Sequence, residues 1–358
     1  MKAIPRGHDL PLLQSRTPRE IRDHLDRFVV GQERAKRAVA VAAYQHLQRV
    51  RAAREGGPVR IRKSNVLLVG PTGCGKTHIA RNLAAAIDVP FTVVDATEYT
   101  EAGYYGKDVE VMIGELLFKS GMDIERTQAG IVFVDEVDKI ARRSHGVRTG
   151  AGSRDIGGEG VQQSMLKLLE GREIFVPLNV TQHWSKHDFV PVDTTHILFI
   201  CAGTFTDLHE YSAAGTLGFA PGSDRRRSGP RRISQRDLQE YGMISEFLAR
   251  LPVIVRLDPL GEDDLVRVLT EPEDALVHEY RTLFALDEVD LRFDPEALRE
   301  IAARARAHRM GARSLRAVME AVLHDDLFHA PETRGVEIVV TADLVCRRLA
   351  EAERDLVS

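Results

Sequence analysis

The sequence predicts an α/β protein, with a parallel sheet covered by helices and a smaller, mostly helical domain after it. Over residues 65–203, short apolar runs alternate with amphipathic segments, which is typical of a parallel sheet. From about Leu257 onward, amphipathic helices dominate and the strand-like runs are short. We therefore expect a leader over residues 1–16, a large α/β domain over 17–256 and a small domain over 257–358.

The expected elements of the large domain follow from periodicity. Each expected strand is a short, continuous apolar run, as in strands that are buried on both faces; these runs are 65–70, 90–96, 130–136 and 196–203. The segment FVPVD before the last run is expected to be a loop. Helical spacing of apolar residues predicts helices from Thr17, over 32–51, 77–87, 107–119 and 158–170. Thr17, Pro18 and Glu20 have the order of a capped helix start.

The small domain is expected to contain two long helices, two short strands and a final helix. The helices span 261–286, 295–328 and 342–354, and the strands span 289–293 and 336–341.

Composition limits the class of protein. Hydrophobic residues make up 43% of the 358 residues, charged residues make up 28%, and the net charge is −4. These values are ordinary for a globular protein, and they provide no general basic field for nucleic acid. The three cysteines are far apart, so neither a disulfide framework nor a zinc site is expected. No signal peptide or membrane span is expected either, and a reducing cytoplasm fits this pattern.

One glycine-rich motif directly follows the first expected strand and precedes a helix. It matches G-x-x-x-x-G-K-[ST] in full and consists of Gly70, Pro71, Thr72, Gly73, Cys74, Gly75, Lys76 and Thr77. Glycines let backbone N–H groups turn around phosphates, and a helix N-terminus adds partial positive charge. We therefore predict an ATP site in which Lys76 reaches the β- and γ-phosphates and Thr77 holds Mg²⁺.

Two adjacent carboxylates end the apolar run IVFVDE, at Asp135 and Glu136. Carboxylates are costly to bury, so two adjacent ones at the end of a buried strand usually serve a function. Asp135 is expected to bind Mg²⁺, and Glu136 is expected to polarise the water that attacks the γ-phosphate. We place Asp135 at the end of a strand that neighbours the one before the glycine motif.

Several stretches together resemble the ClpX family of protein unfoldases over about residues 17–345. They are VVGQERAKRAVAVAAY (29–44), TEAGYYGKDVE (100–110), GEGVQQSMLKLLEG (158–171), SEFLARLPV (245–253) and GARSLR (311–316). The resemblance implies the AAA+ architecture and a ring of six identical subunits with ATP between them. It also implies that Val30 lies on the adenine side of the nucleotide.

The same resemblance assigns two arginines to the reaction. Arg250 matches the arginine finger, which reaches the ATP of the neighbouring subunit, and Arg313 matches the sensor-2 arginine. Either residue taken alone would be interpreted as a surface charge paired with a carboxylate. Thr204 is the nearest candidate for the polar sensor-1 side chain.

Two loops match family motifs that contact other proteins. Tyr104 matches the aromatic residue that grips substrate in the axial channel, and Tyr105 replaces the valine of the family. A glycine-flanked tyrosine offers a rigid amphipathic face to any extended chain. Leu217, Gly218 and Phe219 resemble the family's I-G-F tripeptide, which docks into a ClpP-like peptidase; the alternative is a loop that folds back onto its own domain.

The chain departs from the family pattern in several places. No Cys precedes Cys74, so the N-terminal zinc module has no counterpart and docking through it is not expected. The entrance-loop region 179–189 does not preserve the R-K-H triplet. The arginine-rich segment 224–236 is expected to be a solvated loop, with DNA or an acidic partner as the alternative. His183 and His187 are too few for a metal site.

The leading hypothesis is an ATP-driven unfoldase that threads proteins through a ring, with a ClpP-like peptidase as its partner. The related HslU family is disfavoured because residues 107–134 leave no room for its inserted domain. A non-proteolytic protein remodeller remains an alternative, and a nucleic-acid-linked AAA+ switch is a weaker one.

Overall fold

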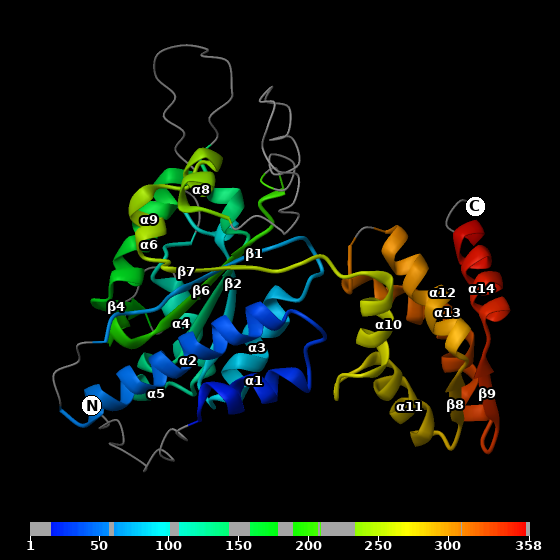
Figure 1. The fold of residues 1–358 in the computed structure, drawn as a ribbon. Helices are drawn as coiled ribbons and strands as arrows, with labels where there is room; N and C mark the ends of the chain where they lie inside the picture. Colours follow the sequence, from blue (N-terminus) through cyan, green and yellow to red (C-terminus); the bar gives the residue numbers. More distant parts are fainter. Residues whose placement is uncertain are drawn as a thin grey trace, which may run out of the picture. The chain divides into compact units, whose positions relative to one another are not determined.

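The computed structural model describes residues 16–56, 61–100, 107–142, 158–177, 189–206, 208, 233–308 and 310–355, which form two compact units (Figure 1). The large unit comprises the chain up to Arg22 together with Arg34–Pro71 and Lys76–Leu257. The small unit comprises Asp23–Glu33, Thr72–Gly75 and the chain from Asp258 onward.

A parallel five-stranded sheet forms the centre of the large unit, as the predicted α/β class requires. Its strands are β1 (Val66–Val69), β2 (Phe91–Asp95), β3 (Ile131–Asp135), β6 (Leu198–Gly203) and β7 (Val253–Arg256), in the order β2-β3-β6-β1-β7. β6 therefore lies between β1 and β3, and the expectation that the Asp135 strand neighbours β1 was wrong. All six residues of β6 are buried, which suits a strand that is paired on both sides.

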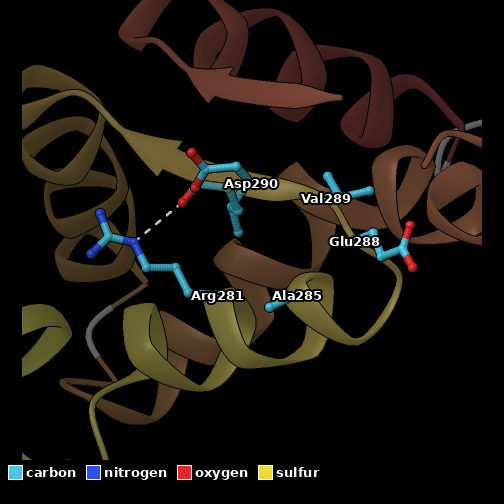
Figure 2. A pocket seen from close by; sticks show the side chains of 6 residues that line it. Arg281, Ala285, Glu288, Val289 and Asp290 are labelled. Atoms are coloured by element: carbon cyan, nitrogen blue, oxygen red, sulfur yellow. Dashed lines mark hydrogen bonds between the residues drawn. The ribbon is translucent and has the colours of Figure 1, made fainter. Parts of the chain in front are cut away.

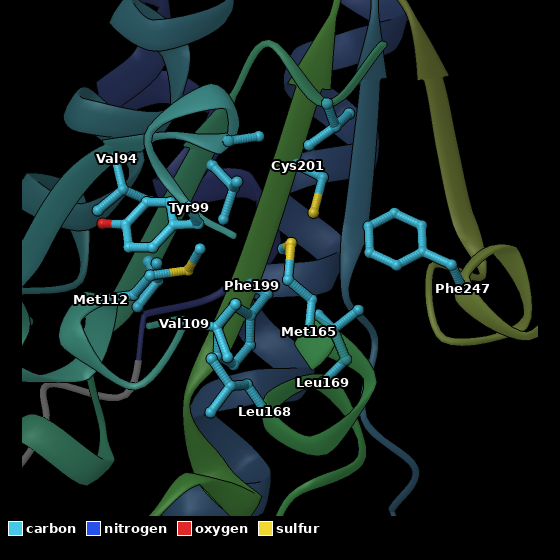
Figure 3. Packing of buried hydrophobic residues seen from close by; sticks show 14 of the residues in the cluster. Val94, Tyr99, Val109, Met112, Met165, Leu168, Leu169, Phe199, Cys201 and Phe247 are labelled. Carbon is cyan, nitrogen blue, oxygen red and sulfur yellow. The ribbon is translucent and has the colours of Figure 1, made fainter. Parts of the chain in front are cut away.

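Helices cover both faces of this sheet. On one face, alternate strand residues such as Leu67, Val132 and Phe199 join one apolar cluster with α4 (Val111–Lys119), α6 (Gly158–Glu170) and α9 (Ser245–Ala249). Figure 3 shows the Met165 and Cys201 side chains in this interior, with Phe199 beside Leu168. α3 (Lys76–Ala86) contacts β2, β3 and β6 without joining the cluster, so it lies on the opposite face.

The first helix begins where the sequence predicted. The side-chain carboxylate of Glu20 accepts hydrogen bonds from the Thr17 backbone N–H at 2.6 Å and from Thr17 Oγ1 at 2.9 Å. The Glu20 N–H donates back to Thr17 Oγ1 at 3.3 Å, which completes a capping box. α1 (Pro18–Asp26) follows, and α2 (Glu33–Arg54) follows it.

The segment that was expected to be a loop before β6 is a strand instead. β4 (Glu173–Pro177) and β5 (Phe189–Asp193) pair as an antiparallel ladder, with Ile174 opposite Val192. Both of these residues are buried, whereas Phe175 and Phe189 are exposed. Buried and exposed side chains thus alternate along these strands, which is the two-residue period of a β-strand.

Short helices and turns link the strands and longer helices of the large unit. They are the helices α5 (Ile124–Gln128) and α8 (Gln235–Tyr241), and the single turns η1 (Ala96–Glu98), η2 (Val137–Ile140) and η3 (Thr194–His196). α8 begins within the arginine-rich segment, so Arg236 is helical and pairs with Glu240 at 2.9 Å.

The small unit is mostly helical, as predicted. Its elements are α10 (Glu262–Thr270), α11 (Leu276–Leu286), β8 (Asp290–Phe293), α12 (Pro295–Ala307), α13 (Arg313–His329), η4 (Ala330–Glu332), β9 (Glu337–Val340) and α14 (Ala342–Asp355). β8 and β9 pair in parallel, and a separate apolar core holds these elements together. Each of the two long helices that we expected is broken in two. Pro272 follows the end of α10, and Gly311, at φ +58°, separates α12 from α13.

Candidate active site

In the large unit, Lys76 is held at the carboxyl end of β1. It is the first residue of α3 and only 8% exposed. Its Nζ donates hydrogen bonds to the Gly70 carbonyl oxygen at 2.7 Å and to the Pro71 carbonyl oxygen at 3.0 Å. The two carbonyls keep the ammonium group beside the turn between strand and helix, where a phosphate would be bound.

Thr77, in the helix that follows β1, and Asp135, at the end of β3, meet at the same edge of the sheet although β1 and β3 are not neighbours. Thr77 Oγ1 lies 3.4 Å from Asp135 Oδ2. A hydroxyl oxygen and a carboxylate oxygen are the hard donors that Mg²⁺ takes together with phosphate oxygens and water. The residues present therefore fit an ATP-bound Mg²⁺ ion.

Glu136 has an unusual backbone conformation for a residue with a side chain. Its φ of 57° and ψ of 31° are left-handed, a conformation that costs roughly 1–2 kcal/mol. Its N–H donates to Asp135 Oδ1 at 2.9 Å. The Glu136 side chain is exposed, and its carboxylate accepts no hydrogen bond from any described residue. The strained turn thus ends β3 and leaves a carboxylate available to water beside Asp135.

Thr204, the sensor-1 candidate, lies just after β6. Its Oγ1 donates to Asp138 Oδ2 at 2.7 Å, and the Phe205 N–H reaches the same oxygen at 3.3 Å. Asp138 belongs to η2 and is only 6% exposed. The carboxylate therefore connects the end of β6 to the turn that contains Glu136.

The small unit contains the glycine turn of the motif, Thr72–Gly75. Gly73 and Gly75 have φ values of +73° and +98°, which favour glycine. A Cβ atom at Gly73 would lie 2.0 Å from the Met310 carbonyl oxygen, and the Gly73 carbonyl accepts a hydrogen bond from the Ala312 N–H at 3.1 Å. The next residue, Arg313, is exposed and has no hydrogen bond or ion pair to a described residue. The predicted sensor-2 arginine thus begins a helix that is docked on the glycine turn.

Val30 belongs to the same unit as this turn and is 8% exposed. Gly31 and Gln32, which follow it, both have positive φ, at 62° and 55°. The Gln32 amide accepts from the Asp258 N–H at 3.0 Å and donates to the Asp258 carbonyl at 2.7 Å. Gln32 belongs to the family-like stretch 29–44, where the sequence alone indicated no role for it, and its double hydrogen bond fixes the turn after Val30.

Arg250 lies away from the residues around Lys76. It follows α9 and precedes β7, at the amino edge of the sheet, whereas Lys76, Thr77 and Asp135 lie at the carboxyl edge. Its Nη2 donates to Glu170 Oε1 at 2.8 Å, and this hydrogen bond is the main cause that lowers the pKa of the Glu170 carboxyl. The four residues of β1 separate the two edges, which corresponds to roughly 13 Å.

The predicted contact loops lie outside the described residues. These are Tyr104 and Tyr105, the tripeptide Leu217, Gly218 and Phe219, the pair His183 and His187, and most of the arginine-rich segment. Their roles stay predictions.

Other surfaces of the described part of the chain add no further reactive cluster. No group of three or more His, Cys, Asp or Glu residues in these ranges has the arrangement of a metal site. None of the described helices combines the length and apolarity that crossing a bilayer requires.

A hollow of about 390 Å³ in the small unit lies between α11 and β8 (Figure 2), where Arg281 Nε donates to the Leu291 carbonyl at 3.2 Å. No residue of the predicted ATP site lines this hollow.

Two family models match the chain. Residues 61–254 match the AAA domain (Cdc48 subfamily), and residues 260–341 match the C-terminal, D2-small domain of ClpB protein. The first match alone spans more than half of the chain and includes all of the large-unit residues described above, from Lys76 to Arg250.

Curated relatives cover nearly the whole chain. An ATP-dependent Clp protease ATP-binding subunit ClpX 2 from Wolinella succinogenes is 42% identical over 329 residues, which is 92% of this chain and 81% of the relative. ClpX subunits from Treponema denticola and Porphyromonas gingivalis are each 40% identical, over 92% and 90% of this chain and 81% and 80% of their own lengths. With this similarity and an ATPase fold of the AAA type, the chain belongs to the ClpX family of AAA+ ATPases.

Proposed function

We propose that the protein is an ATP-dependent protein unfoldase that works as a ring of six subunits. The observation that carries the proposal is the meeting of Thr77 and Asp135 at 3.4 Å, beside the exposed carboxylate of a strained Glu136. This arrangement supports hydrolysis of a Mg²⁺-bound nucleotide. Family membership supports the coupling of hydrolysis to work on other proteins, because the relatives are ATP-binding subunits of a Clp protease.

Each residue has a separate part in this proposal. Lys76 exchanges its carbonyl partners for phosphate oxygens, and Thr77 and Asp135 hold Mg²⁺, which supplies charge neutralisation when it is bound with ATP. Glu136 orients the attacking water and accepts its proton. Arg313, which lies next to the glycine turn, responds to the phosphates from the small unit.

Arg250 completes the site of a neighbouring subunit. Within one chain it lies at the edge of the sheet opposite to Lys76, so it is not placed to act on its own nucleotide. In a head-to-tail ring, one edge of each subunit can face the opposite edge of the next. Such an arginine supplied in trans is worth about 10³–10⁵ in rate in GTPase systems.

The work on client proteins is assigned to the two contact loops. Tyr104, with Tyr105 beside it, grips an extended chain in the axial channel, and Leu217, Gly218 and Phe219 dock a ClpP-like peptidase. Both assignments come from the resemblance of the motifs to those of the family.

A trapping experiment tests the proposal. Glu136→Gln keeps the shape of the side chain and removes the base, so ATP binding should persist while hydrolysis falls by a factor on the order of 10²–10⁴. The stalled ring, purified from its own cells with ATP, should hold client proteins. The proteins that co-purify are then identified, with the exposed-site variant Glu240→Gln as the control.

The identity of the captured proteins separates the alternatives. Many unrelated proteins together with a ring peptidase support a general unfoldase of a degradation machine. One dominant partner without a peptidase supports the dedicated remodeller instead. Normal ATP hydrolysis by Glu136→Gln would contradict the proposed site itself.

A further inference from the structure

Glu170 occupies a fixed position at the end of α6. The last carbonyls of a helix lack partners within it, and here two of them are satisfied by side chains from the segment before β1. Lys63 Nζ donates to the Leu168 carbonyl at 3.3 Å, and Asn65 Nδ2 lies 3.5 Å from the Leu169 carbonyl. Gly171 follows at φ +88°, and a Cβ atom there would lie 2.6 Å from Thr195 Cα. The end of the helix is thus anchored on several sides.

Asn65 connects this anchored end to the backbone of Arg250. Its Nδ2 donates to the Arg250 carbonyl at 3.0 Å, and its Oδ1 accepts from the Phe199 N–H at 3.1 Å. Asn65 is only 1% exposed, so these bonds form in the interior, where an unpaired partner is costly. The main chain at Glu170 and the main chain at Arg250 are therefore held in one fixed geometry.

The Glu170 carboxylate then fixes the side chain of Arg250. One oxygen accepts from Arg250 Nη2 at 2.8 Å, and the other lies 3.5 Å from Arg172 Nη2. A guanidinium group has five N–H donors, and the bond to Glu170 uses one of them. The Arg250 side chain is 49% exposed, so the remaining donors stay accessible at the surface.

We propose that Glu170 is a positioning residue for Arg250: it holds the guanidinium in the orientation in which it meets the nucleotide of the next subunit. This inference rests on the proposed function of Arg250. A free arginine samples many rotamers, and catalysis by a positioned charge depends on few of them. Displacement of a positioned group by about 1 Å can cost up to 10²-fold in rate.

A double-mutant cycle on the assembled full-length protein tests the proposal. Glu170→Gln removes the charge and keeps the size of the side chain; Arg250→Ala removes the guanidinium. We expect Glu170→Gln to lower kcat for ATP on the order of tenfold, with KM for ATP within about twofold, because it acts on orientation and lies away from the chain's own Lys76. In the Arg250→Ala background, the same change should have no further effect on kcat.

Three controls separate positioning from folding. Glu240→Gln removes the partner of Arg236, another exposed ion pair of the large unit, and should leave kcat unchanged. The melting temperature and the ring mass of Glu170→Gln should match those of the parent protein. Asp at position 170 keeps the charge on a shorter side chain, so Glu170→Asp should recover part of the lost kcat.

Other outcomes would contradict either the positioning role of Glu170 alone or the proposed role of Arg250 as well. If Glu170→Gln retains the parent kcat while Arg250→Ala is strongly impaired, the positioning role is wrong and the proposed function stands. A rise in kcat would mean that Glu170 holds Arg250 back, which also overturns the inference. If Arg250→Ala hydrolyses ATP at the parent rate, the proposed role of Arg250 fails, and the positioning role fails with it.

Discussion

At the residue scale, the large unit buries a group of basic side chains near the amino edge of the sheet. His46 and Arg49 are 2% and 3% exposed. His46 Nε2 lies 2.8 Å from the Ala129 carbonyl, and Arg49 Nη2 donates to the His196 carbonyl at 3.2 Å. Burial, with Arg49 as the next cause, lowers the pKa of His46 to about 3, and burial likewise lowers the pKa of Arg49 to about 10. His46 is therefore neutral in the folded protein.

This histidine predicts acid sensitivity of the fold. Its pKa is lowered from 6.5, so between pH 6.5 and 3 the unfolded chain binds more protons, and stability falls as the pH falls. Between pH 7 and pH 5, His46 should account for about 2 kcal/mol of the lost stability. Urea unfolding followed by circular dichroism at the two pH values measures this loss.

The variant His46→Gln, which keeps an N–H donor, should lose that part of the pH dependence. His324→Gln, on the exposed side of α13, is the matched control and should keep the full dependence. An unchanged pH dependence in His46→Gln would show that this histidine is not the acid-sensitive group.

At the element scale, the glycine turn between β1 and α3 predicts a steric test. Gly73→Ala places a Cβ atom 2.0 Å from a backbone oxygen, so the turn must shift and nucleotide affinity should fall by at least tenfold. Gly56 has a similar φ of +70° with no atom within 4 Å, so Gly56→Ala carries only the conformational cost. Binding of a fluorescent ATP analogue measures both variants; equal affinities would contradict the observed packing of Gly73.

A second test at this scale concerns Asn65, which joins β1 to α6, α9 and β6. Asn65→Leu leaves the Phe199 N–H and the Arg250 carbonyl without their partner, so the unfolding free energy should fall by about 2–4 kcal/mol. Asn82→Leu is the control, because Asn82 donates to the His78 carbonyl of its own helix. A loss for Asn65→Leu no larger than that of the control would contradict the linking role.

The elements also show what the sequence can and cannot predict. The strands β1, β3 and β6 were predictable because each is an apolar run with mostly buried positions. β2 was predictable from its sequence, FTVVD, although only two of its five positions are buried. β7 was missed because it is a short strand at the edge of the sheet. Only one of its four residues is buried, so it shows little of the apolar pattern of a central strand. The position of β6 between β1 and β3 was not predictable either, since strand order depends on long-range pairing.

Some residues of the candidate site were likewise predictable from the sequence, and others were not. The glycine motif, Asp135 and Glu136 were identified because their chemistry is encoded in short, contiguous patterns. Glu170 and Asn65 were missed because their partners lie 80 and 185 residues away along the chain. Only the fold brings such partners together.

At the scale of the whole molecule, the opposite positions of Arg250 and Lys76 predict that one chain alone is incomplete. Arg250→Ala and Glu136→Gln should each be nearly inactive as ATPases. Mixed one to one and reassembled, they should regain roughly a quarter of the parent activity, because a quarter of random interfaces join an intact Glu136 to an intact Arg250. ATP hydrolysis by the mixture measures this recovery; an inactive mixture of assembled rings would contradict an arginine supplied in trans.

The most direct test of ATP-driven protein unfolding uses a stable fluorescent protein with an unstructured tail as the client. The parent protein with ATP should extinguish the fluorescence, and Glu136→Gln should not. Tyr104→Ala should keep most of the ATPase activity and lose unfolding, because the grip on the client is removed while the nucleotide site is intact. If the parent protein hydrolyses ATP and the client stays folded, or if Tyr104→Ala unfolds it at the parent rate, the threading account is contradicted.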